Sequence, residues 1–126
     1  MKSPGHQRRP DHKVQEVRLQ GAAQVRVGDE VIADSQDVIR VDEDGSPARL
    51  YFPRSAVAME NLEPSSTTTQ CPFKGTARYF NLNVGGRKLQ DAVWSYEDPF
   101  EEHQALKDRL AFYEEKYPDI RVHAST

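Results

Sequence analysis

Short runs in which apolar and polar residues alternate occur along most of the chain, and this alternation predicts half-buried β-strands. We expect strands at residues 23–27, 31–32, 39–41, 50–52 and 120–122. The first two flank Gly28-Asp29, a pair that suits a two-residue hairpin turn. The fourth ends at Pro53, which lacks the N–H that a sheet ladder needs. The pattern therefore predicts a mainly β protein.

The clearest hairpin covers residues 77–96 and turns at Gly85-Gly86. This turn sets Leu82 opposite Leu89, on the apolar face of both strands. Carrying that register further would set an aspartate opposite a phenylalanine. Because a one-residue shift moves every side chain to the other face, we predict a β-bulge at residues 90–92.

Near the C-terminus the period changes to that of a helix. Leu106, Leu110 and Tyr113 stand at positions i, i+4 and i+7, and acidic residues precede them. The sequence thus predicts one short C-terminal helix that begins near Glu101 and is stopped by Pro118.

The length fits one domain, because 126 residues lie within the roughly 100–150 of a typical domain. Residues 1–13 are polar and basic and predict a disordered tail, which leaves residues 14–126 as a single β-rich domain. The net charge is −3; four basic residues and one aspartate give the tail +3, so the domain carries −6. This negative balance argues against nucleic acid as a partner.

Composition excludes several classes of protein. No apolar run reaches the roughly 18 residues of a membrane helix, and the first residues lack the apolar core of a secretory signal. One cysteine forms no internal disulfide, and the four histidines show no metal-ligand spacing. We therefore expect a cytoplasmic protein with no membrane partner and no metal site. The sequence indicates neither a cofactor nor an oligomeric state.

Three segments, 51–54, 69–75 and 94–99, combine aromatic and charged residues where a strand passes into a turn. Binding residues often lie on such turns above a rigid scaffold, and an aromatic wall with a few polar groups is typical of a small-ligand pocket. The ligand-binding candidates are Tyr51, Arg54, Lys74, Trp94 and Tyr96. Arg54 and Lys74 are the cations that would hold an anionic group.

Two further residues are catalytic candidates, and each has a second interpretation. Cys71, near Lys74, is either an activated nucleophile or a small buried apolar residue. Glu97 is either a general acid or base, or a surface carboxylate in a salt bridge. Trp94 likewise suits the core as well as a pocket, and Arg54 suits an ion pair as well as a ligand.

Four strings carry a resemblance to a known family: Tyr51-Phe52-Pro53-Arg54, Leu62-Glu63-Pro64-Ser65, Thr69-Gln70-Cys71-Pro72-Phe73-Lys74-Gly75 and Ala92-Val93-Trp94-Ser95-Tyr96-Glu97-Asp98-Pro99. In this order and spacing they resemble the family called domain of unknown function 427, over about residues 22–123. The resemblance implies a domain of the β-tent type, in which two antiparallel sheets lean together over a cleft.

Some proteins of that architecture hold zinc with cysteine pairs, which the single cysteine of this chain does not supply. The family is also labelled nucleotidyltransferase-like. Metal-dependent nucleotidyl transfer needs carboxylates that converge on Mg²⁺, and the motif carboxylates Glu63, Glu97 and Asp98 form no close acidic pair on one strand.

Three hypotheses follow. The first is a binding module whose cleft takes a small polar or anionic ligand, with a nucleotide as one candidate. The second is an enzyme, either nucleotidyltransferase-like or with Cys71 as its nucleophile. The third is a structural or protein-interaction domain in which the motifs only maintain the fold.

Overall fold

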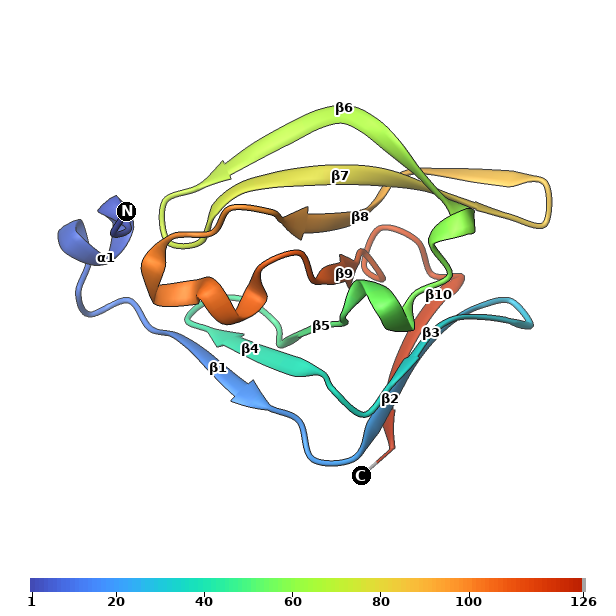
Figure 1. The fold of residues 1–126 in the computed structure, drawn as a ribbon, viewed down its shortest axis with the longest axis horizontal. Coiled ribbons are helices and arrows are strands. Elements are labelled where there is room, and N and C mark those ends of the chain that lie inside the picture. Colours follow the sequence, from blue (N-terminus) through green and yellow to red (C-terminus); the bar gives the residue numbers. More distant parts are fainter. Residues whose placement is uncertain (126) are drawn as a thin grey trace.

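The computed structural model describes residues 1–125, and most of this chain is β-structure (Figure 1). Ten strands form three antiparallel sheets, so the expectation of a mainly β protein is confirmed. The expectation of two sheets is wrong, because the hairpin near the N-terminus pairs with the last strand and forms a sheet of its own. None of the helices in the described part of the chain is long and apolar enough to cross a membrane.

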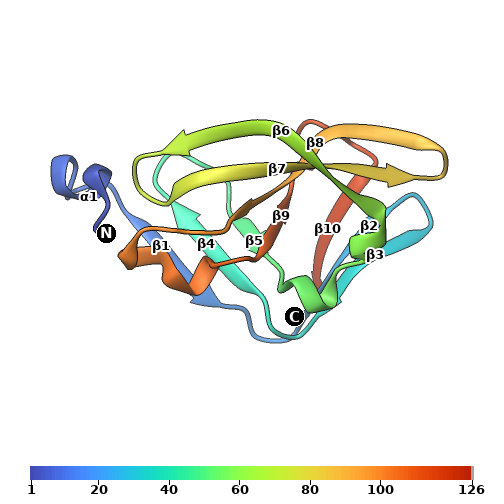
Figure 2. The same ribbon diagram turned by 45° about the horizontal axis from the view of Figure 1, so that its top comes forward.

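The strands group as follows. The first sheet has the order β1 (Val14–Arg18), β4 (Ile39–Glu43), β5 (Arg49–Tyr51). The second has the order β10 (Ile120–Ser125), β2 (Ala22–Val27), β3 (Glu30–Ser35). The third has the order β6 (Leu62–Cys71), β7 (Gly75–Val84), β8 (Arg87–Tyr96), β9 (Leu110–Phe112). Figure 2 shows the third sheet lying across the first. The first sheet lies near the N-terminus in this view, and the second sheet lies at the opposite end of the molecule.

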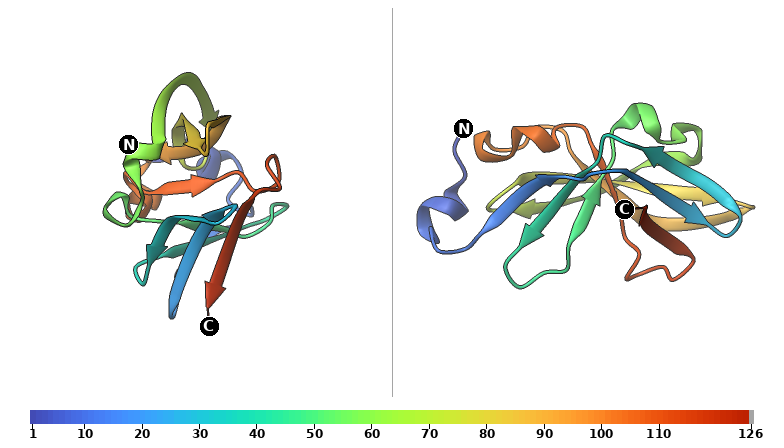
Figure 3. Two further views of the ribbon diagram at one scale, coloured as in Figure 1. Left: turned by 90° about the vertical axis from the view of Figure 1, so that its right-hand side faces the viewer. Right: turned by 90° about the horizontal axis from the view of Figure 1, so that it is seen from below.

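Residues 1–125 also contain four short helices, one before the first strand and three between strands. They are α1 (Pro4–Arg8) and the 3₁₀-helices η1 (Arg54–Ala56), η2 (Met59–Asn61) and η3 (Glu101–Leu106). Figure 3 shows α1 at the end of the molecule where η3 also lies.

The β7–β8 hairpin confirms the predicted bulge. Leu82 pairs with Leu89, and the next pair joins Phe80 to Val93, so residues 90–92 lie opposite a single residue of β7. The middle residue of the bulge is Asp91, with a φ of 53°. Its carboxylate accepts hydrogen bonds from two hydroxyls of β6, Ser65 at 2.5 Å and Thr67 at 2.7 Å. These bonds fix a backbone conformation that residues other than glycine rarely adopt.

The prediction of a C-terminal helix from Glu101 to Pro118 is wrong except over its first residues, which form η3. η3 ends at Leu106, and Asp108 has a φ of 64°, which no α-helix accommodates. The chain then continues as β9, the fourth strand of the third sheet. The three side chains of β9 are all buried, so burial on both sides of a sheet favours a strand over the helix that the spacing suggested.

The two faces of β8 contribute to different parts of the core. Val93 packs in the larger cluster, with Phe80, Phe52 and Phe112. Tyr96 belongs to a smaller cluster beneath the first sheet, with Val41, Tyr51 and Ala111, and Trp94 packs against it. The alternation of the strand therefore sends Trp94 and Tyr96 toward the first sheet.

Residues 1–13, for which the composition predicts disorder, contact the loop of residues 71–75. The N–H of Gly5 donates to the carbonyl of Pro72 at 2.7 Å. The ring of Phe73 lies between two imidazoles, 5.0 Å from that of His6 and 4.3 Å from that of His12. A measurement of this segment's mobility in solution would decide between the composition and these contacts.

Candidate ligand-binding site

A cavity of about 250 Å³ opens between the first and third sheets. Four of the five predicted ligand-binding residues line it: Tyr51, Lys74, Trp94 and Tyr96. Tyr51 ends β5, Trp94 and Tyr96 come from β8, and Lys74 comes from the turn between β6 and β7. Residues from three separate motifs therefore meet at one place in the fold.

Aromatic rings form much of the cavity wall. Around Trp94, the ring of Tyr113 stands edge-on at a centroid distance of 5.5 Å and that of Tyr79 is tilted at 6.1 Å. The Trp94 Nε1–H donates to the hydroxyl of Tyr51 at 3.3 Å. The ring of Tyr51 in turn lies 6.3 Å from that of Tyr96. These contacts hold the rings in place, which gives the cavity a defined shape.

An ion pair lies at the edge of this aromatic wall. Lys74 Nζ donates to Glu43 Oε1 at 2.6 Å, and the other oxygen of that carboxylate is 3.0 Å from His12 Nε2. Burial by itself would lower the pKa of Lys74, but the bond to Glu43 together with the nearby Cys71 and Tyr51 outweighs it and raises the pKa. For Glu43, burial would raise the pKa, but its bonds to Lys74 and His12 lower it. Both groups are therefore charged at neutral pH.

Arg49 adds a second cation to the lining. Its guanidinium lies 5.0 Å from the centre of the Trp94 ring, within the range of a cation–π contact. It also makes two hydrogen bonds of 2.8 Å to the carboxylate of Glu115, which lower the pKa of that carboxyl group. Arg49 is thus fixed in orientation by a bidentate pair.

Two phenol groups face the cavity from its floor. Tyr51 is 2% exposed and Tyr96 is 6% exposed. Burial raises the pKa of both phenols above the usual value. They are therefore neutral and carry their protons throughout the physiological pH range.

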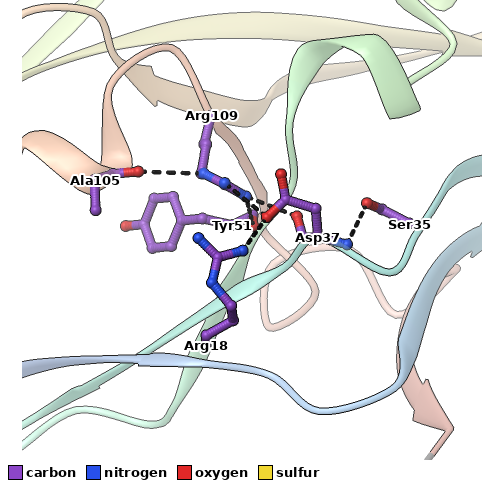
Figure 4. A network of polar contacts seen from close by, with 6 residues as sticks. All are labelled: Arg18, Ser35, Asp37, Tyr51, Ala105 and Arg109. Carbon is purple, nitrogen blue, oxygen red and sulfur yellow. Dashed lines mark hydrogen bonds and ion pairs between the residues drawn. The ribbon is translucent and has the colours of Figure 1, made fainter.

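Figure 4 shows the network of polar contacts around the main chain at Tyr51. Arg109 donates to the carbonyl of Tyr51 at 3.4 Å and to the carbonyl of Asp37 at 2.7 Å. The carboxylate of Asp37 binds both Arg109 and Arg18. The hydrogen bonds from Arg109 and Arg18 lower the pKa of that carboxyl group. This network anchors the end of β5, from which the Tyr51 ring enters the cavity.

The structure does not bring Arg54 and Glu97 to this cavity. They line a second one of about 430 Å³ on the opposite face of β8. Arg54 donates to Glu97 Oε2 at 3.0 Å and to the carbonyl of Asp108 at 2.7 Å, while Arg78 binds the other oxygen of Glu97. The predicted pair of cations, Arg54 and Lys74, is therefore split between two faces of the sheet.

Cys71 is half-buried at the end of β6, opposite Gly75, and packs against the smaller core cluster. It is not among the residues that line the first cavity. Of the motif carboxylates, Glu63 binds Asn81 and Lys88 and does not line the cavity. Residues 1–125 contain no cluster of three or more His, Cys, Asp or Glu side chains with metal-ligand geometry.

Sequence reasoning missed the other seven lining residues, which include the charged and aromatic side chains of Glu43, Arg49, Tyr79 and Tyr113. Tyr79 could have been predicted from the sequence, because the predicted hairpin places it opposite Trp94 on the same face. Glu43 and Arg49 border a polar stretch that resembles an ordinary loop, and only the pairing of β4 with β5 turns them toward β8.

Comparisons with known proteins agree with the motifs. No curated protein matches the chain. A family profile described as a domain of unknown function, DUF427, matches residues 16–123. Since the match includes nearly all of the three sheets, the chain belongs to the DUF427 family.

Proposed function

We propose that this protein is a binding domain for a small polar ligand with a planar ring, and that the ligand occupies the cavity between the first and third sheets. The observation that carries the proposal is the convergence of Tyr51, Lys74, Trp94 and Tyr96, from three separate motifs, on one open cavity. Polar and charged groups placed within an aromatic wall are typical of ligand sites. We also propose that these two sheets are the leaning pair of the β-tent type.

The size of the cavity supports a small ligand. Its volume of about 250 Å³ lies just below the range of roughly 300–1,000 Å³ of sites for drug-sized molecules. A single ring with its substituents is small enough for this volume, and the base of a nucleotide is a planar ring of that kind. The walls suit a ring as well, because the edges and faces of Trp94 and Tyr79 favour stacked or edge-on aromatic contacts.

The contacts favour binding over the enzyme hypothesis. Glu97 lies on the opposite face of β8 from the cavity, and each of its oxygens is held by a guanidinium group. Cys71 packs against the smaller core cluster and does not line the cavity. The two catalytic candidates therefore share no common space in which a substrate would meet both.

Tryptophan fluorescence tests the proposal directly, because the chain has one tryptophan and it lines the cavity. We would titrate the protein with a panel of small ring compounds and with nucleosides and nucleotides, and follow the emission of Trp94. A saturable change for at least one compound, lost in Lys74→Met and kept in Lys88→Met, is expected. Lys88 is a matched control since it is exposed, paired with Glu63, and not among the residues that line the cavity. No saturable change with any compound would refute the proposal.

A further inference from the structure

Several hydrogen-bond donors in the cavity have no acceptor among residues 1–125. The hydroxyl of Tyr51 accepts from Trp94, which leaves its own proton unused. Tyr96 makes ring contacts but its hydroxyl has no hydrogen bond within the described chain. Lys74 has three N–H donors, and only one acceptor, Glu43, binds them. No fully buried side-chain N or O atom among residues 1–125 lacks a hydrogen-bond partner, so the Tyr96 hydroxyl is accessible from the cavity. A ligand that supplies acceptors can therefore reach this set of donors.

These donors lie close to one another. Lys74 Nζ is 5.9 Å from the centre of the Tyr96 ring, and the rings of Tyr96 and Tyr51 are 6.3 Å apart. All three side chains are more than nine-tenths buried. A ligand group that reaches them is therefore largely removed from water, where hydrogen bonds to a charged acceptor are strongest.

The charge of the lining favours an anion. Arg49 and Lys74 are positive and Glu43 is negative, so the charged residues that line the cavity sum to +1 in a chain whose net charge is −3. Glu115, the carboxylate paired with Arg49, is not among the lining residues. Both oxygens of Glu43 already have partners, Lys74 and His12. The one carboxylate of the lining is thus occupied and is a poor acceptor for a cationic ligand.

From these observations we propose that the ligand is a planar ring that carries an oxyanion, with the oxyanion bound by Lys74, Tyr51 and Tyr96 and the ring against Trp94. This inference rests on the proposed function and specifies its ligand class. A carboxylate and a phosphate ester present the same acceptor chemistry, and the experiment below tells them apart.

The test compares four probes by the fluorescence of Trp94: benzoate, phenyl phosphate, benzamide and acetate. Benzamide keeps the ring and the planar shape of benzoate without its charge, and acetate keeps the charge without the ring. We expect benzoate or phenyl phosphate to bind at least about tenfold more tightly than benzamide, since bonds to charged groups are the stronger ones. The tighter of the two identifies the oxyanion, and acetate alone should bind weakly.

The variant Tyr96→Phe removes one donor and keeps the ring. It should weaken binding of the anionic probe about tenfold and leave benzamide unchanged. Tyr117→Phe is the matched control, because Tyr117 donates to the carbonyl of Gln90 and does not line the cavity. Equal binding of benzamide and both anions, or unchanged anion binding in Tyr96→Phe, would overturn the inference and leave the proposed function standing. Binding of none of the ring probes or of the wider panel would instead remove the proposed function itself.

Discussion

Replacement of Lys74 by methionine tests whether the ion pair beside the cavity stabilises the fold. Lys74 is 7% exposed and donates to Glu43 at 2.6 Å. Methionine keeps most of the side-chain volume but removes the charge, which leaves the half-buried carboxylate with His12 as its remaining partner. Removal of one member of a buried pair typically destabilises a protein by roughly 3–5 kcal/mol, because the other charge stays buried without compensation.

The structure places this variant at or below the lower limit of that range. The Glu43 side chain retains 18% of its exposure and its bond to His12. We therefore expect Lys74→Met to lower the free energy of unfolding by about 2–3 kcal/mol. Glu43→Gln should cost at least as much, because Lys74 is the more deeply buried partner. The double variant should be more stable than the sum of the two single losses indicates, by about 1–2 kcal/mol.

Urea denaturation followed by Trp94 fluorescence measures these differences at neutral pH. The sign of the pH dependence provides a second readout. The pKa of Glu43 is lowered by folding, so its stabilisation is present above the usual carboxyl pKa and is lost as the pH falls through the lowered value. The pKa of Lys74 is raised, so its stabilisation is lost only at alkaline pH. A free energy of unfolding in Lys74→Met equal to that of the surface control Lys88→Met would refute this reasoning.

Three further predictions concern other parts of the fold. His6 and His103 share a hydrogen bond of 2.9 Å between their Nε2 atoms, and burial, followed by the proximity of His103, lowers the pKa of His6. The docking of residues 1–13 should therefore hold above pH 6.5 and be lost as the pH falls below it; amide NMR line widths that stay constant between about pH 7 and pH 5 would contradict this. Gly5→Ala should release the same segment at neutral pH, because a Cβ there would lie 2.6 Å from the carbonyl oxygen of Pro72; hydrogen exchange of residues 1–13 as slow as in the wild type would argue against it. Asp91→Ala should lower the free energy of unfolding by about 2 kcal/mol, since two hydroxyls of β6 lose their acceptor. Asp91→Asn should lose less, and a urea midpoint of Asp91→Ala equal to that of the wild type would show that the carboxylate is dispensable.

Where strand pairing depends on local pattern, the sequence was informative. The bulge at residues 90–92 follows from a mismatch of faces in the hairpin itself. The register of Leu82 with Leu89 follows from the glycine turn. These features involve neighbours in sequence, so no knowledge of the rest of the fold is needed to predict them.

Features that depend on distant parts of the chain were not predictable in this way. The spacing of Leu106, Leu110 and Tyr113 fits a helix, but residues 110–112 pair with β8 and are buried on both sides. Tertiary contacts thus override the local period there. In the site, Lys74 and the motif aromatics Tyr51, Trp94 and Tyr96 stood out by type. Arg49 did not, because its place in the cavity depends on how the first and third sheets pack.

Chemical-shift mapping with benzoate and with phenyl phosphate tests the central claim most directly, and the tighter-binding anion is the informative one. In ¹⁵N-labelled protein, the account predicts saturable shifts that centre on the Trp94 indole N–H and on the amides of Lys74 and Tyr96, and that weaken in Tyr96→Phe. These three residues line one cavity, so their shifts should follow a single binding curve. Saturable shifts confined to the second cavity, around Arg54 and Glu97, or the absence of saturable shifts, would contradict it.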